Sequence, residues 1–337
     1  MGTYHFMGVG RSVGAITCAV DYIEKALHNP AASEILFKGT GGINHPENHP
    51  GKIEALVLFT SKEIIERNPQ FPAHRYEGTS QPEAARTEIE KVLRKVWKTS
   101  YPERKIFWCE VDIDNYEDCF EKVVKATYRF SPLKKQGKEI WCNLTSGSDS
   151  LGLALLSMSE LTAKSTKRYL LSQKQDYRSF VTVPPQIKLL PNRDNYFRLL
   201  PFIKKTIDVF EFYEILAELE NTQKLLRSSE LFNRLRSRNL FTNLDEDSFT
   251  RQYLIKIYSL GYTELLSSNS EQKNKQQNKE KQDQDKYVAL TEMGVRFLNE
   301  ELEELKSLVD FEDILSYSPE DIVDISKHWP WFYETVL

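Results

Sequence analysis

The chain has 337 residues, more than one average domain holds, so two domains is the natural expectation. Hydrophobic residues make up 40% and charged residues 28%, which is typical of a globular protein with a core. The formal net charge of -4 excludes a global basic excess, so any nucleic-acid site would have to be a local patch. No apolar stretch approaches the ~20 residues of a membrane-spanning helix, and we expect no membrane partner.

The cysteines show neither a CxxC pair nor metal-ligand spacing; they are Cys18, Cys109, Cys119 and Cys142. Three of them lie in apolar runs, where a free cysteine usually behaves as a small buried hydrophobe. No secretory signal is recognisable, so this pattern predicts a cytoplasmic protein. We expect it to carry neither a metal nor a cofactor.

Residues 1–190 predict alternating strands and helices. The expected strands are 4–9, 55–60, 105–111, 139–144, 167–172 and 180–183, and the expected helices are 15–27, 83–98, 116–128 and 151–164. Apolar strands that alternate with amphipathic helices are typical of a mostly parallel sheet covered on both faces. The predicted fold class is therefore α/β, with a Rossmann-like sheet domain. In such sheets, ligands bind at the carboxyl ends of the strands, near the point where strand order reverses.

Residues 200–306 predict a second domain of a different kind. Expected helices at 208–226, 229–238 and 245–260 are followed by a hairpin and a helix that begins near Thr291. This order predicts an α+β winged helix-turn-helix domain. Residues 267–286 hold almost no apolar side chains and are expected to be a disordered wing insertion. Residues 307–337 are expected to form a C-terminal appendix.

The predicted second domain carries cations of the kind that contact phosphates and base edges in DNA. The DNA-binding candidates are Arg234, Arg236, Arg238, Arg251 and Lys256. Winged helices also serve as dimerisation or protein-contact modules. DNA and protein therefore both stay open as partners of this domain.

Two glycine-containing turns follow predicted strands and open predicted helices. MGVGRSVGA spans residues 7–15, and NLTSGSDSLG spans residues 143–152. Glycine lets the backbone approach a ligand, and a helix start offers unpaired N–H groups to an anion. A tight turn or a helix cap is the structural alternative for each loop alone. Together, at one sheet edge, they predict a cleft rich in hydrogen-bond donors and suited to phosphates and riboses.

A dehydrogenase is disfavoured, because the second predicted strand ends in Thr60, Ser61 and Lys62 and lacks an acid for a ribose. The order GxGRSVGA, LVLFTSKE and WCNLTSGSDSLGLAL resembles the CARF family, the CRISPR-associated Rossmann folds, over residues 4–183. The resemblance implies a ligand site built from three loops. The first loop contributes Gly10, Arg11 and Ser12, the second Thr60, Ser61 and Lys62, and the third Asn143, Thr145, Ser146, Gly147 and Ser148.

By this resemblance the ligand is a cyclic oligoadenylate, the messenger of type III CRISPR complexes, and we expect cyclic tetraadenylate. The family typically works as a homodimer, with the two-fold symmetric messenger across the interface. An unrelated nucleotide-binding regulator is a further alternative.

Whether the chain is an enzyme stays open at this point. A sensor would relay messenger binding to the winged helix. A ring nuclease would cut the messenger by metal-independent 2'-hydroxyl attack, in which Ser12 would be the catalytic residue. In the ring nucleases that this chain resembles, a basic residue of the later loop assists the cut. Asp149 stands at that place here, so binding ranks above cleavage. No HEPN motif is found, since no arginine precedes His328 at positions 321–324, and no PD-(D/E)xK pattern is evident.

Overall fold

The computed structural model describes residues 2–37, 51–98, 104–132, 138–162, 164–172, 174–200, 208–222, 225–267, 286–310 and 329–337. These residues form two compact units. The first unit holds described residues of 2–131, 138–200 and 329–337, and the second holds Pro132 and those of 208–310.

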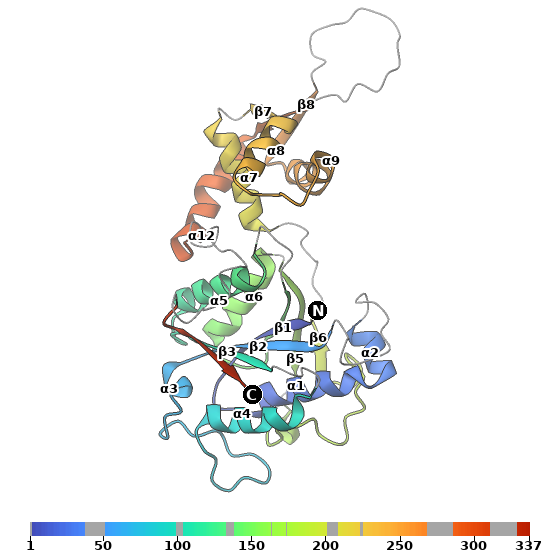
Figure 1. The fold of residues 1–337 in the computed structure, drawn as a ribbon, viewed down its shortest axis with the longest axis vertical. Coiled ribbons are helices and arrows are strands. Elements are labelled where there is room, and N and C mark those ends of the chain that lie inside the picture. Colours follow the sequence, from blue (N-terminus) through green and yellow to red (C-terminus); the bar gives the residue numbers. More distant parts are fainter. Residues whose placement is uncertain are drawn as a thin grey trace, which may run out of the picture. The chain divides into compact units, whose positions relative to one another are not determined.

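Among the described residues, seven strands form the sheet of the first unit, in the order β10-β3-β2-β1-β4-β5-β6 (Figure 1). Their bounds are β1 Thr3–Gly8, β2 Ile53–Thr60, β3 Lys105–Glu110, β4 Glu139–Asn143, β5 Ser165–Leu171, β6 Phe197–Leu199 and β10 Phe332–Val336. The five inner strands are parallel, whereas β6 and β10 are antiparallel edge strands. The mostly parallel, Rossmann-like α/β sheet is thus confirmed. Strand order reverses between β1 and β4, which is the point where such sheets bind ligands.

Helices cover both faces of this sheet (Figure 1). They are α1 Gly14–Leu27, α2 Pro30–Leu36, α3 Lys62–Ile65, α4 Ala85–Val96, α5 Tyr116–Phe130 and α6 Asp149–Leu161. α1 packs against α4 on one face, and α5 packs against α6 on the other. α1, α3, α5 and α6 each follow a parallel strand, so the loops between strand ends and helix starts gather at one edge of the sheet.

β1 is buried along its whole length, as expected for a central parallel strand. Successive side chains alternate between the two faces of a strand. Tyr4 meets Phe130 of α5 with ring centroids 4.9 Å apart, whereas Met7 belongs to the core that α1 and α4 cover. The four cysteines are all buried, which confirms the prediction made for three of them.

The expected C-terminal appendix needs correction for residues 329–337. They return to the first unit, where β10 pairs antiparallel with β3. Phe332 is buried and rests on Phe107, with ring centroids 5.3 Å apart. The segment belongs to the sheet because it satisfies the hydrogen-bonding edge of β3 and buries Trp329 and Phe332. Residues 311–328 lie outside the described residues.

The predicted strand at 180–183 is wrong. This segment is irregular, and its backbone is held by α1. The carbonyl oxygen of Val181 accepts a hydrogen bond from Thr17 Oγ1 at 2.6 Å, and the amide of Val183 donates to the Asp21 carboxylate at 2.6 Å. The strand that pairs with β5 comes later, at β6.

The second unit combines helices with a three-stranded antiparallel sheet of order β7-β9-β8. Its elements are α7 Val209–Asn221, β7 Leu225–Arg227, α8 Ser228–Ser237, α9 Glu246–Phe249, the π-helical turn Thr250–Leu254, α10 Ile255–Ser259, β8 Thr263–Ser267, β9 Lys286–Leu290, α11 Glu292–Arg296, the π-helical turn Phe297–Glu301 and α12 Leu302–Leu308. Asp245 and Thr291 cap the starts of α9 and α11 through their side chains, as a helix N-cap should.

The three helices predicted for this region correspond to α7, α8 and α9–α10, whereas β7 was not expected. The expected wing insertion, 267–286, begins and ends in paired strand residues, since Ser267 lies opposite Lys286. Residues 268–285 lie outside the described residues. No helix in the described ranges is long and apolar enough to traverse a bilayer.

Candidate functional site

The three loops singled out in the sequence lie side by side at one edge of the sheet. β1 pairs with β2 on one side and with β4 on the other, and all three strands are parallel. The residues that follow their carboxyl ends are therefore neighbours. The first loop stands between the second and third loops, at the reversal of strand order.

The first and third loops touch backbone to backbone. A Cβ atom on Gly8 would lie 2.4 Å from the carbonyl oxygen of Ser146 and 2.9 Å from the Cα of Gly147. Gly147 has φ +109, a conformation that side-chain-bearing residues rarely adopt. Both glycines are thus needed for the close approach of the two loops. Gly10 differs, because a Cβ there would meet nothing within 4 Å, and its surroundings are open.

Three of the predicted ligand-binding side chains are engaged in holding the loops. Thr60 Oγ1 donates to the carbonyl oxygen of Val9 at 2.8 Å, and the Ser146 hydroxyl donates to that of Gly8. The side chain of Asn143 is buried. Its Nδ2 donates to the carbonyl oxygen of Ala15 at 3.3 Å, and its Oδ1 accepts from the backbone N–H of Thr145 at 2.9 Å. These residues position the loops through satisfied hydrogen bonds, which is a structural role.

Ser12 and Thr145 line one small cavity of about 30 Å³. Ser172, Tyr177, Arg178 and Cys18 contribute to the same cavity. Burial raises the pKa of the Cys18 thiol to about 12, so it does not supply a thiolate nucleophile. The first and third loops therefore share a hollow through Ser12 and Thr145, whereas Arg11 and the 146–148 segment do not line it.

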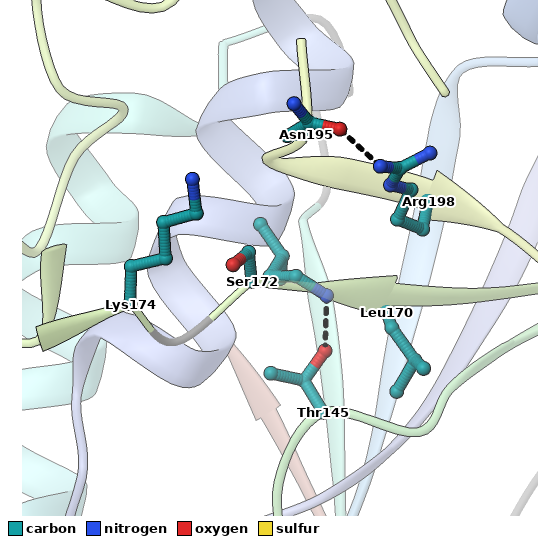
Figure 2. A pocket seen from close by; sticks show the side chains of 7 residues that line it. Thr145, Leu170, Ser172, Lys174, Asn195 and Arg198 are labelled. Carbon is teal, nitrogen blue, oxygen red and sulfur yellow. Dashed lines mark hydrogen bonds between the residues drawn. The ribbon is translucent and has the colours of Figure 1, made fainter. Parts of the chain in front are cut away.

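Thr145 also lines a wider hollow of about 450 Å³ at the ends of β5 and β6 (Figure 2). Its polar lining includes Ser172, Lys174, Asn195 and Arg198. Thr145 Oγ1 accepts from the amide of Leu171 at 2.8 Å, which ties the third loop to the end of β5. Hydroxyls from two loops and two cations thus surround one space.

Arg11 lines neither of these cavities. Its side chain is exposed, and its Nε donates to the carbonyl oxygen of Pro72 at 2.7 Å. Its own carbonyl oxygen accepts from the amide of His74 at 2.8 Å. The first loop is therefore braced from outside by the segment between α3 and α4.

The remaining predicted site residues lie away from the two cavities. Ser61 precedes α3, and Lys62 Nζ lies 3.7 Å from Glu66 Oε1 in an exposed pair. Ser148 caps α6 by accepting from the amide of Leu151 at 3.3 Å. Asp149 is exposed in the first turn of α6, so it brings negative charge to the third loop.

The residues that β5 and β6 contribute to the hollow were not among those predicted from the sequence. Lys174 follows β5, Asn195 precedes β6 and Arg198 lies within β6, so polar residues at these strand ends are a usable signal. The apolar run at 180–183 hides this signal, because it is similar to a strand whereas the strand that pairs with β5 is β6.

The five DNA-binding candidates of the second unit differ in their availability. Arg234 pairs with Glu230 at 2.8 Å and with Glu218 at 3.5 Å, and Arg238 pairs with Glu214 and with Glu218. Two of the five cations are thus neutralised within the unit.

The other three candidates carry different constraints. The Arg236 guanidinium lies 5.9 Å from the ring centroid of Phe232, and Arg251 Nε donates to the carbonyl oxygen of Asp247 at 3.2 Å. Burial lowers the pKa of Lys256 below its ordinary value. These three cations are spread over α8, the π-helical turn and α10.

Comparison with known proteins gives distant similarities. No family model matches the chain. An uncharacterized protein of Archaeoglobus fulgidus is 29% identical over 192 residues, which cover 51% of this chain and 58% of that protein, so the chain spans less than two thirds of that relative. A solved structure of Enterococcus italicus Csm6 bound to cyclic hexa-2'-fluoro-hexa-dAMP is 12% identical, with a TM-score of 0.37, and the match covers 77% of this chain and 54% of that one. At these values neither similarity assigns the chain to a family.

Proposed function

We propose that the first unit binds a cyclic oligoadenylate in the hollow beside the first and third loops. One observation carries the proposal: Ser12 and Thr145, from loops far apart in the sequence, line the same cavity. Thr145 continues into the wider hollow with Lys174 and Arg198. The motif resemblance to the CARF family supplies the ligand class, and this geometry is compatible with it.

The chemistry of the hollow fits a ligand that repeats phosphates and riboses. Ser12, Thr145 and Ser172 offer hydroxyls that donate and accept hydrogen bonds, as ribose hydroxyls require. Lys174 and Arg198 offer positive charge to phosphodiesters. The open surroundings of Gly10 leave room for the ligand backbone next to the first loop.

We propose that the ligand is the messenger of type III CRISPR defence, with cyclic tetraadenylate as the first ring to test. The motif resemblance is the support for this choice, and it also suggests a homodimer with the ring across the two-fold interface. The molar mass in solution, with and without the ring, tests the dimer.

Binding without cleavage is the favoured outcome. Asp149 at the third loop is exposed and would oppose negative charge building up on a phosphate. Ser12 is the residue that could assist the alternative reaction, in which the ribose 2'-hydroxyl attacks the adjacent phosphorus and the 5'-oxygen leaves. That reaction would yield linear products with a 2',3'-cyclic phosphate.

Incubation of the protein with cyclic tetraadenylate, followed by chromatography, separates these outcomes. The expected result is saturable binding by calorimetry and an intact ring. Linear products that disappear in Ser12→Ala would establish the ring nuclease. No binding of any ring size would overturn the proposal for this unit.

For the second unit we propose a winged helix that contacts a protein. Arg234 and Arg238 are paired with glutamates, which weakens the case for DNA phosphates. Large apolar side chains are exposed along α10 and at the residue that caps its end: Ile255 is 44%, Tyr258 50% and Leu260 49% exposed. Such side chains suit a protein surface better than a phosphate backbone.

A titration with random-sequence duplex DNA tests this choice. We expect weak binding by the full chain at about 50 mM salt and little further change at about 200 mM. A tight complex that loses about a thousandfold in affinity over that interval would restore DNA as the partner.

A further inference from the structure

The loop that leads into β6 has an unusual backbone. Leu189, Asn192 and Asn195 have φ of +50, +66 and +57, in the left-handed region that residues other than glycine seldom adopt. Asparagine tolerates this region better than most residues, but leucine does not. Such conformations persist where the surrounding contacts hold them, and they are common at binding sites.

This loop orients one side chain, the guanidinium of Arg198. Its Nη1 donates to the carbonyl oxygen of Asn192 at 2.9 Å, and its Nη2 donates to the side-chain oxygen of Asn195 (Figure 2). The Asn192 side chain accepts from the amide of Leu199 at 2.7 Å, which fixes the loop to β6. Arg198 is therefore held before any ligand arrives, which lowers the entropy cost of binding.

The partners of Arg198 are neutral, so its charge is retained. The adjacent acid, Asp194, is occupied by other donors: the amides of Leu190, Tyr196 and Phe197 and the hydroxyl of Tyr22. Other arginines of this unit are neutralised, as Arg168 is by Glu160 and Arg86 by Glu90. Within the described part of the chain, neither Arg198 nor Lys174 forms an ion pair.

We propose that Arg198 binds a phosphodiester of the ligand and that Asn195 is its positioning residue. This inference rests on the function proposed above and adds the anionic part of the same site. Thr145 lines both cavities, so a ligand that contacts Ser12 and Arg198 passes over it. Lys174, on the same hollow, adds a second cation (Figure 2).

The first test compares the unmodified chain with the Arg198→Gln variant. Glutamine keeps much of the length of the arginine side chain but removes its positive charge. Calorimetry with cyclic tetraadenylate should show a loss of affinity of about tenfold or more, which shrinks as salt rises. Arg193→Ala is the matched control, because Arg193 is an exposed arginine of the same loop that lines neither cavity. Its affinity should equal that of the unmodified chain.

The second test separates orientation from charge at Asn195. Asn195→Gly removes the amide without backbone strain at φ +57, and it should weaken binding only in the presence of Arg198. Asn195→Asp keeps the acceptor but neutralises the guanidinium, so its loss should approach that of Arg198→Gln. Melting curves identify any variant that fails to fold, and the remaining variants then decide.

The outcomes separate the two claims. Unchanged affinity in Arg198→Gln, while the unmodified chain binds the ring, overturns this inference alone. Absence of binding by the unmodified chain to every ring size overturns the proposed function, and this inference with it.

Discussion

A Cβ atom on Gly147 would lie 3.1 Å from the Cα of Gly8, so these two glycines seat the third loop against the end of the central strand. The contact joins the two segments that border the reversal of strand order. Ser146 strengthens it by donating to the Gly8 carbonyl oxygen. The hollow next to Ser12 depends on this close approach.

Gly8→Ala should destabilise the first unit and impair ligand binding. The added methyl group meets backbone atoms of Ser146 and Gly147, which cannot move aside without shifting the third loop. We expect a loss of about 1–3 kcal/mol, measured by denaturant unfolding. Gly10→Ala is the control for stability, because its methyl group meets nothing. Equal stability of the Gly8 variant and the unmodified chain would refute the tight contact.

We expect the ligand to extend beyond the two cavities over the first loop, so Arg11→Ala should weaken binding of the cyclic oligoadenylate more than tenfold, about 1.4 kcal/mol or more. Its Nε is engaged by Pro72, and among the described residues neither terminal nitrogen has a protein partner, so both can face a phosphate. Calorimetry measures the effect, and Arg193→Ala again serves as the control. An unchanged dissociation constant would remove Arg11 from the site.

His5 should make stability fall in mild acid. Burial, aided by the charge of Lys167, lowers its pKa to about 3, so it stays neutral in the folded state between Thr3 and Tyr169. The unfolded chain takes up a proton as pH falls below about 6.5, and stability is lost progressively from there toward pH 3. Melting curves between about pH 7 and about pH 4 measure this loss. In His5→Gln the dependence should be flatter; an identical slope would contradict the assignment.

Phe332→Ala should destabilise the first unit by about 3–5 kcal/mol. The ring is 1% exposed and packs on Phe107 and Phe130, so its removal leaves a cavity under β10. The matched control is Val336→Ala on the same strand, since Val336 is 53% exposed. Thermal unfolding monitors both. If the two variants melted alike, the chain end would not contribute to the core as the structure indicates.

The central part of the first unit could be predicted from the sequence because its signals are local. Apolar runs such as 55–60 and the amphipathic helix of 83–98 mark elements within a residue or two of β2 and α4, and glycines at strand ends mark the turns. Once these strands are taken as parallel, their carboxyl ends must share an edge. That Ser12 and Thr145 line the same cavity follows from that topology.

What only the tertiary structure decided depends on partners distant in the chain. Phe332–Val336 holds residues that favour strands, but its pairing with the edge of β3 is set only by the tertiary structure. Thr60, Asn143 and Ser146 are polar residues of the kind that bind ligands. In the fold, their side chains instead donate hydrogen bonds to backbone carbonyl oxygens of the first loop and its helix. Arg198 reaches the hollow through a loop whose left-handed residues are held by contacts formed only on folding. Hydrophobic periodicity and secondary-structure propensity report the local preferences of a segment. The roles of these residues are set instead by pairing between segments distant in the chain, and by which polar groups still lack a protein hydrogen-bond partner after folding.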